Sequence, residues 1–174
     1  MPGKSVNMKK ALKIDTIIFT ALMLYVIAGC EPELSKHYSL KRQDEYQHIA
    51  IICVPKSDAG PDYTNQILKE VENNTKNHLG FLKKVDCFSG IPVDMVSTLP
   101  KVDLGNFTGY DAVLCLAYSY EFDEAYLDFY MLDTKTTKCI WYHQFASADV
   151  DPGAKLVEYG KWVPVAVKIA FYGL

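Results

Sequence analysis

Two short apolar segments limit what this chain can fold into more than any other feature. They are residues 49–54 (IAIICV) and 112–118 (AVLCLAY). A strand with one face in water alternates apolar and polar residues, whereas a strand buried on both faces is apolar along its length. Both segments are therefore predicted to be buried strands, and the first to be covered on both faces.

A helix is predicted after the first of these strands. Apolar or small side chains recur every four residues from Tyr63 to Leu79, which marks one face of an amphipathic helix, and Gly80 ends the pattern. Residues 81–87 (FLKKVDC) form the next strand candidate. A strand–helix–strand unit of this kind favours parallel pairing.

The clearest pattern is a β-hairpin. Residues 126–132 (YLDFYML) and 139–145 (CIWYHQF) are rich in aromatic side chains, and a polar turn over 133–138 joins them. The carboxylate of Asp133 can accept a bond from the main-chain N–H two residues on, which favours the turn.

The remaining segments complete the predicted order. A short helical turn is expected around residues 103–107, and residues 153–171 are predicted to be helical, with Pro164 either kinking the helix or starting a second one. The fold class is therefore α/β (α+β), in the order β-α-β-α-β-β-β-α. We expect a single mixed sheet of about five strands with helices packed on it.

The first 29 residues differ from the rest of the chain. Four lysines precede residue 16, and residues 16–29 are uncharged and mostly apolar. This run is shorter than the roughly 20 residues of a membrane-spanning helix, but it matches a signal-peptide core behind a basic start. Residues 1–29 are therefore predicted to be a signal peptide, with translation starting at Met1 or Met8.

The end of this segment resembles the lipobox of bacterial lipoproteins. Ile27, Ala28, Gly29 and Cys30 supply an aliphatic residue, two small residues and a cysteine, directly behind the apolar core. The resemblance implies that the Cys30 thiol carries a diacylglycerol and that the chain is cleaved before Cys30. The alternative is an uncleaved anchor or an ordinary core helix.

Lipidation of Cys30 would organise the mature chain. The polar residues 30–47 then form a tether, and residues 48–174 form the domain. Removing four lysines and Asp15 leaves 14 basic and 20 acidic residues, a formal charge of −6. An acidic domain is not attracted to anionic lipid heads, so the acyl chains should hold the protein at the membrane. Glu31, rather than an aspartate, follows Cys30, which favours the outer membrane facing the periplasm.

Two motifs of the domain resemble the amino-terminal domain of TolB. They are residues 109–114 (GYDAVL), which lead into a strand, and residues 132–141 (LDTKTTKCIW), which form the hairpin. A similar hairpin occurs in related envelope lipoproteins such as CsgG and FlgO. The resemblance covers roughly residues 48–145 and implies a fold and an envelope role without enzymatic activity. Thr137 stands where the family has a glycine, which puts the turn type in question.

The cysteines and histidines give no motif for metal or redox chemistry. Cys53, Cys87, Cys115 and Cys139 lie in or beside predicted strands, without a C-x-x-C pair, and are interpreted as packing thiols, with disulfides as the alternative. The histidines show no paired spacing, so neither a metal nor a cofactor other than the lipid is expected; they are His37, His48, His78 and His143. The acidic stretch 121–124 (EFDE) is interpreted as a solvated loop.

Aromatic side chains of the hairpin are the candidate partner-binding face. Its residues are Tyr126, Tyr130, Trp141 and His143. Strand alternation puts Trp141 and His143 on one face of the sheet, and Ile140 and Tyr142 on the other. An exposed aromatic face would mark a protein-binding site.

Three functions are compatible with these features. The first is a non-enzymatic, lipid-anchored protein that binds another envelope protein. The second is a subunit of a homo-oligomeric envelope or secretion complex of the CsgG type. The third is an enzyme whose unrecognised site uses Asp123, Glu124 or His143. With a formal net charge of −3, the chain has no basic excess, so no nucleic acid is expected as a partner. No small-molecule substrate is indicated either.

The lipobox gives a direct prediction for Cys30→Ala. This variant lacks the thiol that accepts the lipid, so we expect an unprocessed precursor that takes up no radioactive fatty acid in growing cells. Gel mobility and fatty-acid labelling measure both effects. Normal labelling of the variant would refute the lipobox interpretation.

Overall fold

The computed structural model describes residues 45–56, 62–95, 99–121, 124–148 and 151–172. The chain divides into two units, residues 1–34 and 35–174, and all described residues belong to the second. The predicted signal peptide, the lipobox and most of the tether lie outside the described residues, so the predicted limits at residues 29 and 47 stay predictions.

The described residues form seven strands, two α-helices and a 3-10 helix. In chain order these are β1 (His48–Pro55), α2 (Thr64–His78), β2 (Lys84–Phe88), β3 (Val93–Asp94), β4 (Lys101–Val102), η2 (Leu104–Phe107), β5 (Ala112–Glu121), β6 (Glu124–Asp133), β7 (Cys139–Ala148) and α3 (Pro152–Tyr172). None of the helices in this described part is long and apolar enough to cross a membrane.

Five strands make one mixed sheet in the order β2-β1-β5-β6-β7. Strand β1 is parallel to both neighbours, with Ile51 opposite Cys87 on β2 and opposite Leu114 on β5. Strands β5, β6 and β7 are antiparallel. The predicted fold class is thus confirmed, and the two apolar segments that predicted buried strands lie side by side inside the sheet.

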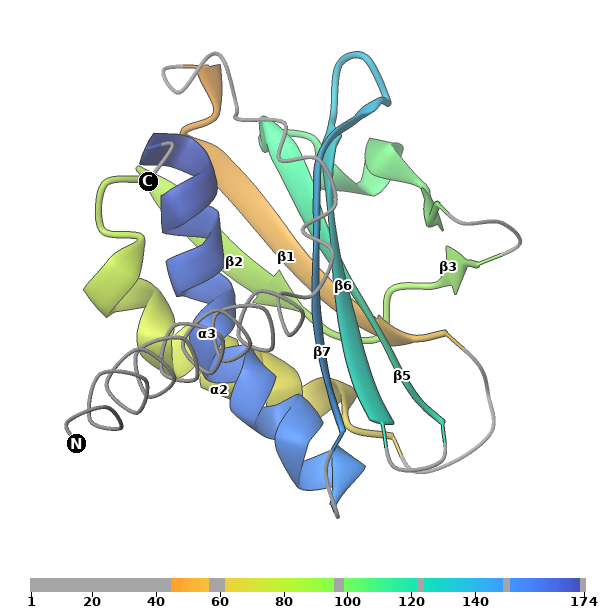
Figure 1. Ribbon diagram of the computed structural model, residues 1–174. Helices are drawn as coiled ribbons and strands as arrows, with labels where there is room; N and C mark the ends of the chain where they lie inside the picture. Colours follow the sequence, from red (N-terminus) through yellow and green to blue (C-terminus); the bar gives the residue numbers. More distant parts are fainter. Residues whose placement is uncertain (1–44, 57–61, 96–98, 122–123, 149–150, 173–174) are drawn as a thin grey trace, which may run out of the picture. The chain divides into compact units, whose positions relative to one another are not determined.

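The two α-helices pack on one face of the sheet (Figure 1). Ile49, Ile51 and Leu114 point from the central strands into this layer and are fully buried. Helices α2 and α3 also pack against each other, and a Cβ atom at Gly160 of α3 would lie 2.8 Å from the main-chain oxygen of Ile67. Gly160 therefore permits the close approach of the two helices.

The opposite face is covered by the chain between β2 and β5. The β3–β4 pair and η2 lie on this side of the sheet (Figure 1). Phe107 of η2 is buried against the sheet, and Phe88 and Tyr110 contact its ring edge to face, with centroids 5.6 and 6.5 Å away. A short helical turn predicted around residues 103–107 is confirmed, whereas the β3–β4 pair was not predicted, because two-residue strands leave no periodic pattern.

Asp111, the residue before β5, holds the beginning of β1 through hydrogen bonds. Its Oδ2 accepts bonds from the main-chain N–H of Gln47 at 2.9 Å and of His48 at 2.8 Å, and it lies 3.0 Å from Nδ1 of His48. Burial alone would raise the pKa of Asp111, but these bonds outweigh it and hold the pKa below the usual 3.8. The lowered pKa stabilises the fold above the unfolded-state value, and this contribution is lost as the pH falls through the folded value.

Three local details depart from simple sequence patterns. Strand β2 begins at Lys84 rather than Phe81, and the N–H of Leu82 instead bonds to the main-chain oxygen of Leu79 at 3.0 Å. Helix α3 runs through Pro164 as one helix. Ile140 packs with the helix-side core, as Trp141 does, because a register shift between Met131 and Leu132 interrupts the alternation of β7. The expectation that Ile140 faces the other side was therefore wrong.

The hairpin turn contains a strained residue. The Oδ1 of Asp133 accepts bonds from the N–H of Lys135 at 2.9 Å and of Thr136 at 2.6 Å, as the sequence predicted for residue 135. Thr137 has φ +59°, the left-handed conformation that glycine adopts freely. Thr137 thus has the backbone conformation that a glycine at this position would favour.

We expect Thr137→Gly to stabilise the protein by about 0.5–1 kcal/mol, because the relief of left-handed strain exceeds the added chain entropy of glycine. Urea unfolding followed by circular dichroism measures the change. Thr136→Gly is the matched control: its φ is not positive, so this variant should lose stability. Equal losses in both variants would contradict the strain argument.

Candidate functional site

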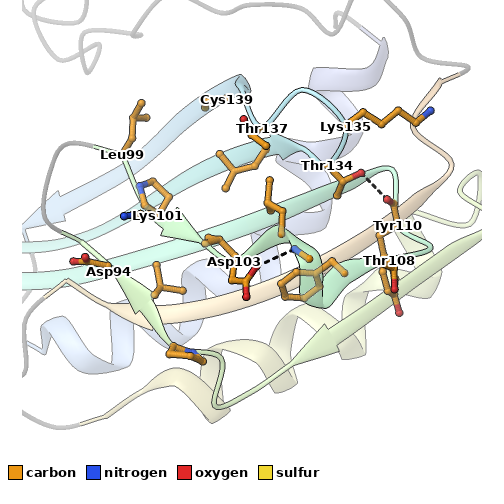
Figure 2. Close-up of a pocket in the computed structure, with 18 of the residues that line it drawn as sticks. Asp94, Leu99, Lys101, Asp103, Thr108, Tyr110, Thr134, Lys135, Thr137 and Cys139 are labelled. Atoms are coloured by element: carbon orange, nitrogen blue, oxygen red, sulfur yellow. Dashed lines mark hydrogen bonds between the residues drawn. The ribbon is translucent and has the colours of Figure 1, made fainter.

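An open groove lies on the face of the sheet opposite the α-helices (Figure 2). Its volume is about 1570 Å³, above the roughly 300–1,000 Å³ of typical small-molecule pockets. Apolar side chains from several elements line it, namely Val93, Val102, Leu104, Phe107 and Leu132. Charged side chains lie among them, namely Asp94, Lys101, Asp103 and Lys135. A groove of this size and character suits an extended chain better than a compact ligand.

Hydrogen bonds hold the walls of the groove in place. Asp103 accepts a bond from the N–H of Gly105 at 3.1 Å, which caps η2. The hydroxyl of Thr134 donates to the main-chain oxygens of Tyr110 at 2.7 Å and of Asp111 at 3.0 Å, which ties the hairpin turn to the start of β5. Two of these bonds are drawn in Figure 2. The hairpin turn is thus tied to the residues that lead into β5, and η2 is capped by a bond within its own segment.

A buried carboxylate lies on the same face, in a second pocket of about 590 Å³. Asp128, in the middle of β6, is 1% exposed. Its Oδ2 forms an ion pair with Nζ of Lys56, the residue that follows β1. Its Oδ1 accepts bonds from the hydroxyl of Tyr142 at 2.9 Å and from Nε2 of Gln144 at 2.6 Å. We call these four residues, together with Tyr130, the Asp128 cluster.

The two tyrosines of the cluster are held as proton donors. Burial raises the pKa of Tyr142, and its bond to Asp128 raises it further. Burial also raises the pKa of Tyr130, as does the nearby Asp128 carboxylate. Their rings lie 5.1 Å apart. Both hydroxyls therefore stay protonated at neutral pH.

This arrangement is better suited to binding than to proton abstraction. Both oxygens of Asp128 already have partners, so the carboxylate is not placed to take a proton from a ligand. Lys56 is partly exposed, and the hydroxyl of Tyr130 has no hydrogen-bond partner among the described residues. Met95 and Leu99 complete the pocket wall, and Leu99 also lines the groove. The cluster is thus a polar end beside a mostly apolar groove.

The four predicted face residues do not share one face. Trp141 is buried on the helix side, and His143 stacks on it with ring centroids 5.9 Å apart. Tyr130 lies on the opposite, groove side of the sheet, and strand alternation puts Tyr126 there too. The prediction that these four side chains form one aromatic surface was therefore wrong, because they point to both sides of the sheet.

All four described cysteines are free thiols. Cys53 and Cys115 lie on the neighbouring strands β1 and β5, but on opposite faces of the sheet, which keeps them apart. Burial raises the pKa of Cys115 to about 12, with a further contribution from Cys139. Burial likewise raises the pKa of Cys87 to about 12. The interpretation as packing thiols is confirmed for these residues.

The residues named for an enzymatic alternative are not brought together. Asp123 lies outside the described residues. Glu124 is exposed and accepts a hydrogen bond from Tyr126. It pairs with Ala148 at one end of the β6–β7 ladder, whereas His143 pairs with Phe129 near the middle. Among the described residues, no group of three or more His, Cys, Asp or Glu side chains could hold a metal ion.

Sequence reasoning missed the Asp128 cluster, although a signal was present. Asp128 is a lone acidic residue inside an apolar and aromatic strand, which is unusual for a buried position. Tyr142 and Gln144 alternate on the next strand, so their side chains share a face. The register of β6 and β7, with Asp128 opposite Gln144, is what brings them together.

The chain is similar to several solved structures. A PelC dodecamer from Paraburkholderia phytofirmans has 11% sequence identity and a TM-score of 0.47, over 80% of this chain and 94% of that one. TolB from Acinetobacter baumannii has 14% identity and a TM-score of 0.43, over 82% of this chain and only 31% of TolB. A lipoprotein from Neisseria meningitidis has 15% identity and a TM-score of 0.33, over 71% of this chain and 97% of that one.

TolB, whose motifs the sequence resembles, is therefore among the similar structures, as is a bacterial lipoprotein. No protein-family model matches the chain, and no curated protein sequence matches it. The resemblance to CsgG and FlgO stays a prediction.

We expect Lys56→Met to destabilise the protein by about 2–3 kcal/mol, because it leaves the buried Asp128 carboxylate without its counter-charge. The double variant Lys56→Met/Asp128→Asn removes the uncompensated charge and should recover most of this loss. Chemical denaturation of the unmodified protein, the single variants Lys56→Met and Asp128→Asn, and the double variant measures the coupling. Lys155→Met is the control, because it breaks the surface pair with Glu158 and should cost less than about 1 kcal/mol. Additive effects at positions 56 and 128 would contradict the pairing.

Proposed function

We propose that this protein is a non-enzymatic lipoprotein of the cell envelope that binds an extended segment of another envelope protein in the groove. The groove on the face of the sheet opposite the α-helices is the observation that carries the proposal. It is open and large, it has an apolar floor, and charged side chains lie among its lining. Those features suit a peptide with apolar side chains, whose main-chain polar groups remain accessible to water and to the charged rim.

The lipobox supports the envelope location. Acyl chains on Cys30 would hold the protein at a membrane, and each buried CH₂ group of a chain contributes about 0.8 kcal/mol. We place the protein at the outer membrane facing the periplasm, because Glu31 rather than an aspartate follows Cys30. A polar tether then lets the domain reach a partner within the same compartment.

The walls of the groove support binding by a preformed site. Asp103 and Thr134 hold η2 and the hairpin turn through hydrogen bonds within the domain. A site that is ordered before binding loses less conformational entropy when the partner arrives. Leu99 is 49% exposed at the point where the groove meets the pocket of the Asp128 cluster. It is the natural first contact for an apolar side chain of the partner.

A photo-crosslinking amino acid in place of Leu99 tests the proposal in growing cells. We expect one dominant heterologous adduct, identified by mass spectrometry. The adduct should fall at least fivefold when Val102→Asp is added, because a carboxylate then lies on the groove floor. The same crosslinker at Asn73, an exposed residue of α2, is the matched control and should give no such adduct.

Two outcomes would contradict this proposal. An adduct between two copies of this chain, together with a defined oligomer in light scattering, would favour the homo-oligomeric subunit instead. Equal adducts from positions 99 and 73 would show that the groove does not select the partner.

A further inference from the structure

Helix α3 carries an exposed apolar stripe that the groove does not use. Of the four exposed large apolar side chains in the described part of the chain, three lie on this helix. They are Trp162, 52% exposed, Ile169, 42% exposed, and Tyr172, 47% exposed. The half-buried Val165 lies between them, and the spacings of three, four and three residues put all four on one side of the helix. We call this set the α3 stripe.

The α3 stripe ends where the tether enters the domain. The ring of Tyr172 contacts that of Phe81, with centroids 5.1 Å apart. Two residues on, the N–H of Lys83 bonds to the main-chain oxygen of Gln47 at 2.9 Å, just before β1 begins. The start of β1 and the end of α3 are at the same end of the sheet (Figure 1). A lipid on Cys30 would therefore be attached through the end of the domain at which the stripe finishes.

The length of the tether keeps the stripe near the membrane. Cys30 and Glu45 are 15 positions apart in the sequence. Even fully extended, such a segment spans at most roughly 50 Å. The domain of an acylated protein therefore meets the bilayer surface continually, at a high effective concentration, and a modest apolar surface is enough to dock it.

The chemistry of the stripe fits the interfacial zone of a bilayer. Tryptophan and tyrosine prefer this zone because their rings are apolar at one end and polar at the other. Lys161 is exposed and Lys168 half-buried beside the stripe, and a lysine can lay its stem along apolar surface while its ammonium group reaches phosphate. Helix α3 has three lysines and one glutamate, against a mature chain of net charge −6. Basic charge is thus concentrated locally.

A second protein is a poorer occupant of this surface. Stable protein–protein interfaces take roughly 20–30 residues from each side. The α3 stripe has four residues, and the ion pair between Lys155 and Glu158 limits it on the side away from the tether. Such a small surface adds to an existing anchor, but it does not suffice for a dimer.

We propose that the α3 stripe docks on the surface of the membrane that holds the lipid, with Trp162 inserted into the interfacial zone. The inference rests on the proposed lipid anchor. It orients the domain, because the groove lies on the other face of the sheet from α3. The groove would then face away from the bilayer, toward a partner in the aqueous compartment.

The two tryptophans allow a direct test, since the chain contains only Trp141 and Trp162. In the Trp141→Phe variant, all tryptophan fluorescence comes from Trp162 in the α3 stripe. In the matched Trp162→Phe variant, it comes from the buried Trp141. Each acylated protein is reconstituted into vesicles of phosphatidylethanolamine and phosphatidylglycerol that contain brominated phosphatidylcholine. We expect brominated lipid to quench Trp162 at least threefold more than Trp141. The additional changes Ile169→Ser and Tyr172→Ser should abolish this excess, with circular dichroism confirming the fold.

The outcomes separate the inference from the anchor on which it rests. If aqueous acrylamide quenches the fluorescence of Trp162 and brominated lipid does not, the inference is overturned. If the intact mass of the same protein includes acyl chains, the lipoprotein proposal still holds. The inference is also overturned if Trp162 becomes less accessible to acrylamide as more protein is added per vesicle, without quenching by brominated lipid. That result would indicate that a second copy of the chain covers the α3 stripe. If the intact mass shows no acyl chains, the anchor fails. Quenching of the unmodified protein by added vesicles then decides the inference by itself.

Discussion

The parallel pairing of β1 with β5 is the constraint on which the rest of the structure depends. These strands are apolar on both sides, so neither face of the sheet can be left to water at its centre. One face is covered by α2 and α3, and the other by η2 and the short β3–β4 pair. The second cover is much smaller than the first. Two packed helices cover one face of the sheet, whereas only a short, irregular segment covers the other. The groove lies on this second, less fully covered face.

The two faces of the sheet have different consequences for function. The helix side is a large continuous core, and its outer surface carries the α3 stripe. The other side combines an open groove with the Asp128 cluster, where Lys56, Tyr142 and Gln144 satisfy a carboxylate that is taken out of water. A domain held by its lipid and its helix side would present the groove outward. Proposed anchoring and proposed binding thus use opposite sides of one sheet and do not compete for surface.

Prediction from the sequence succeeded where a pattern repeats along the chain. The apolar runs of β1 and β5, the four-residue period of α2 and the aromatic hairpin all follow from local periodicity. Prediction failed where the pairing of strands decides on which face of the sheet a side chain lies. Tyr130 and Trp141 were grouped as one face because both are aromatic, yet the sheet separates them. The bulge beside Ile140 and the two-residue strands β3 and β4 leave no local signal of comparable strength.

The sequence by itself determined the five strands of the main sheet, the helices and the candidate lipid site at Cys30, because hydrophobic periodicity and short motifs act over neighbouring residues. Only the tertiary structure decided which side chains meet. Asp128 gains its partners through the register of β6 with β7 and through Lys56 at the end of β1, 72 positions earlier in the chain. Contacts between such distant residues depend on strand order and register, and these are properties of the whole sheet.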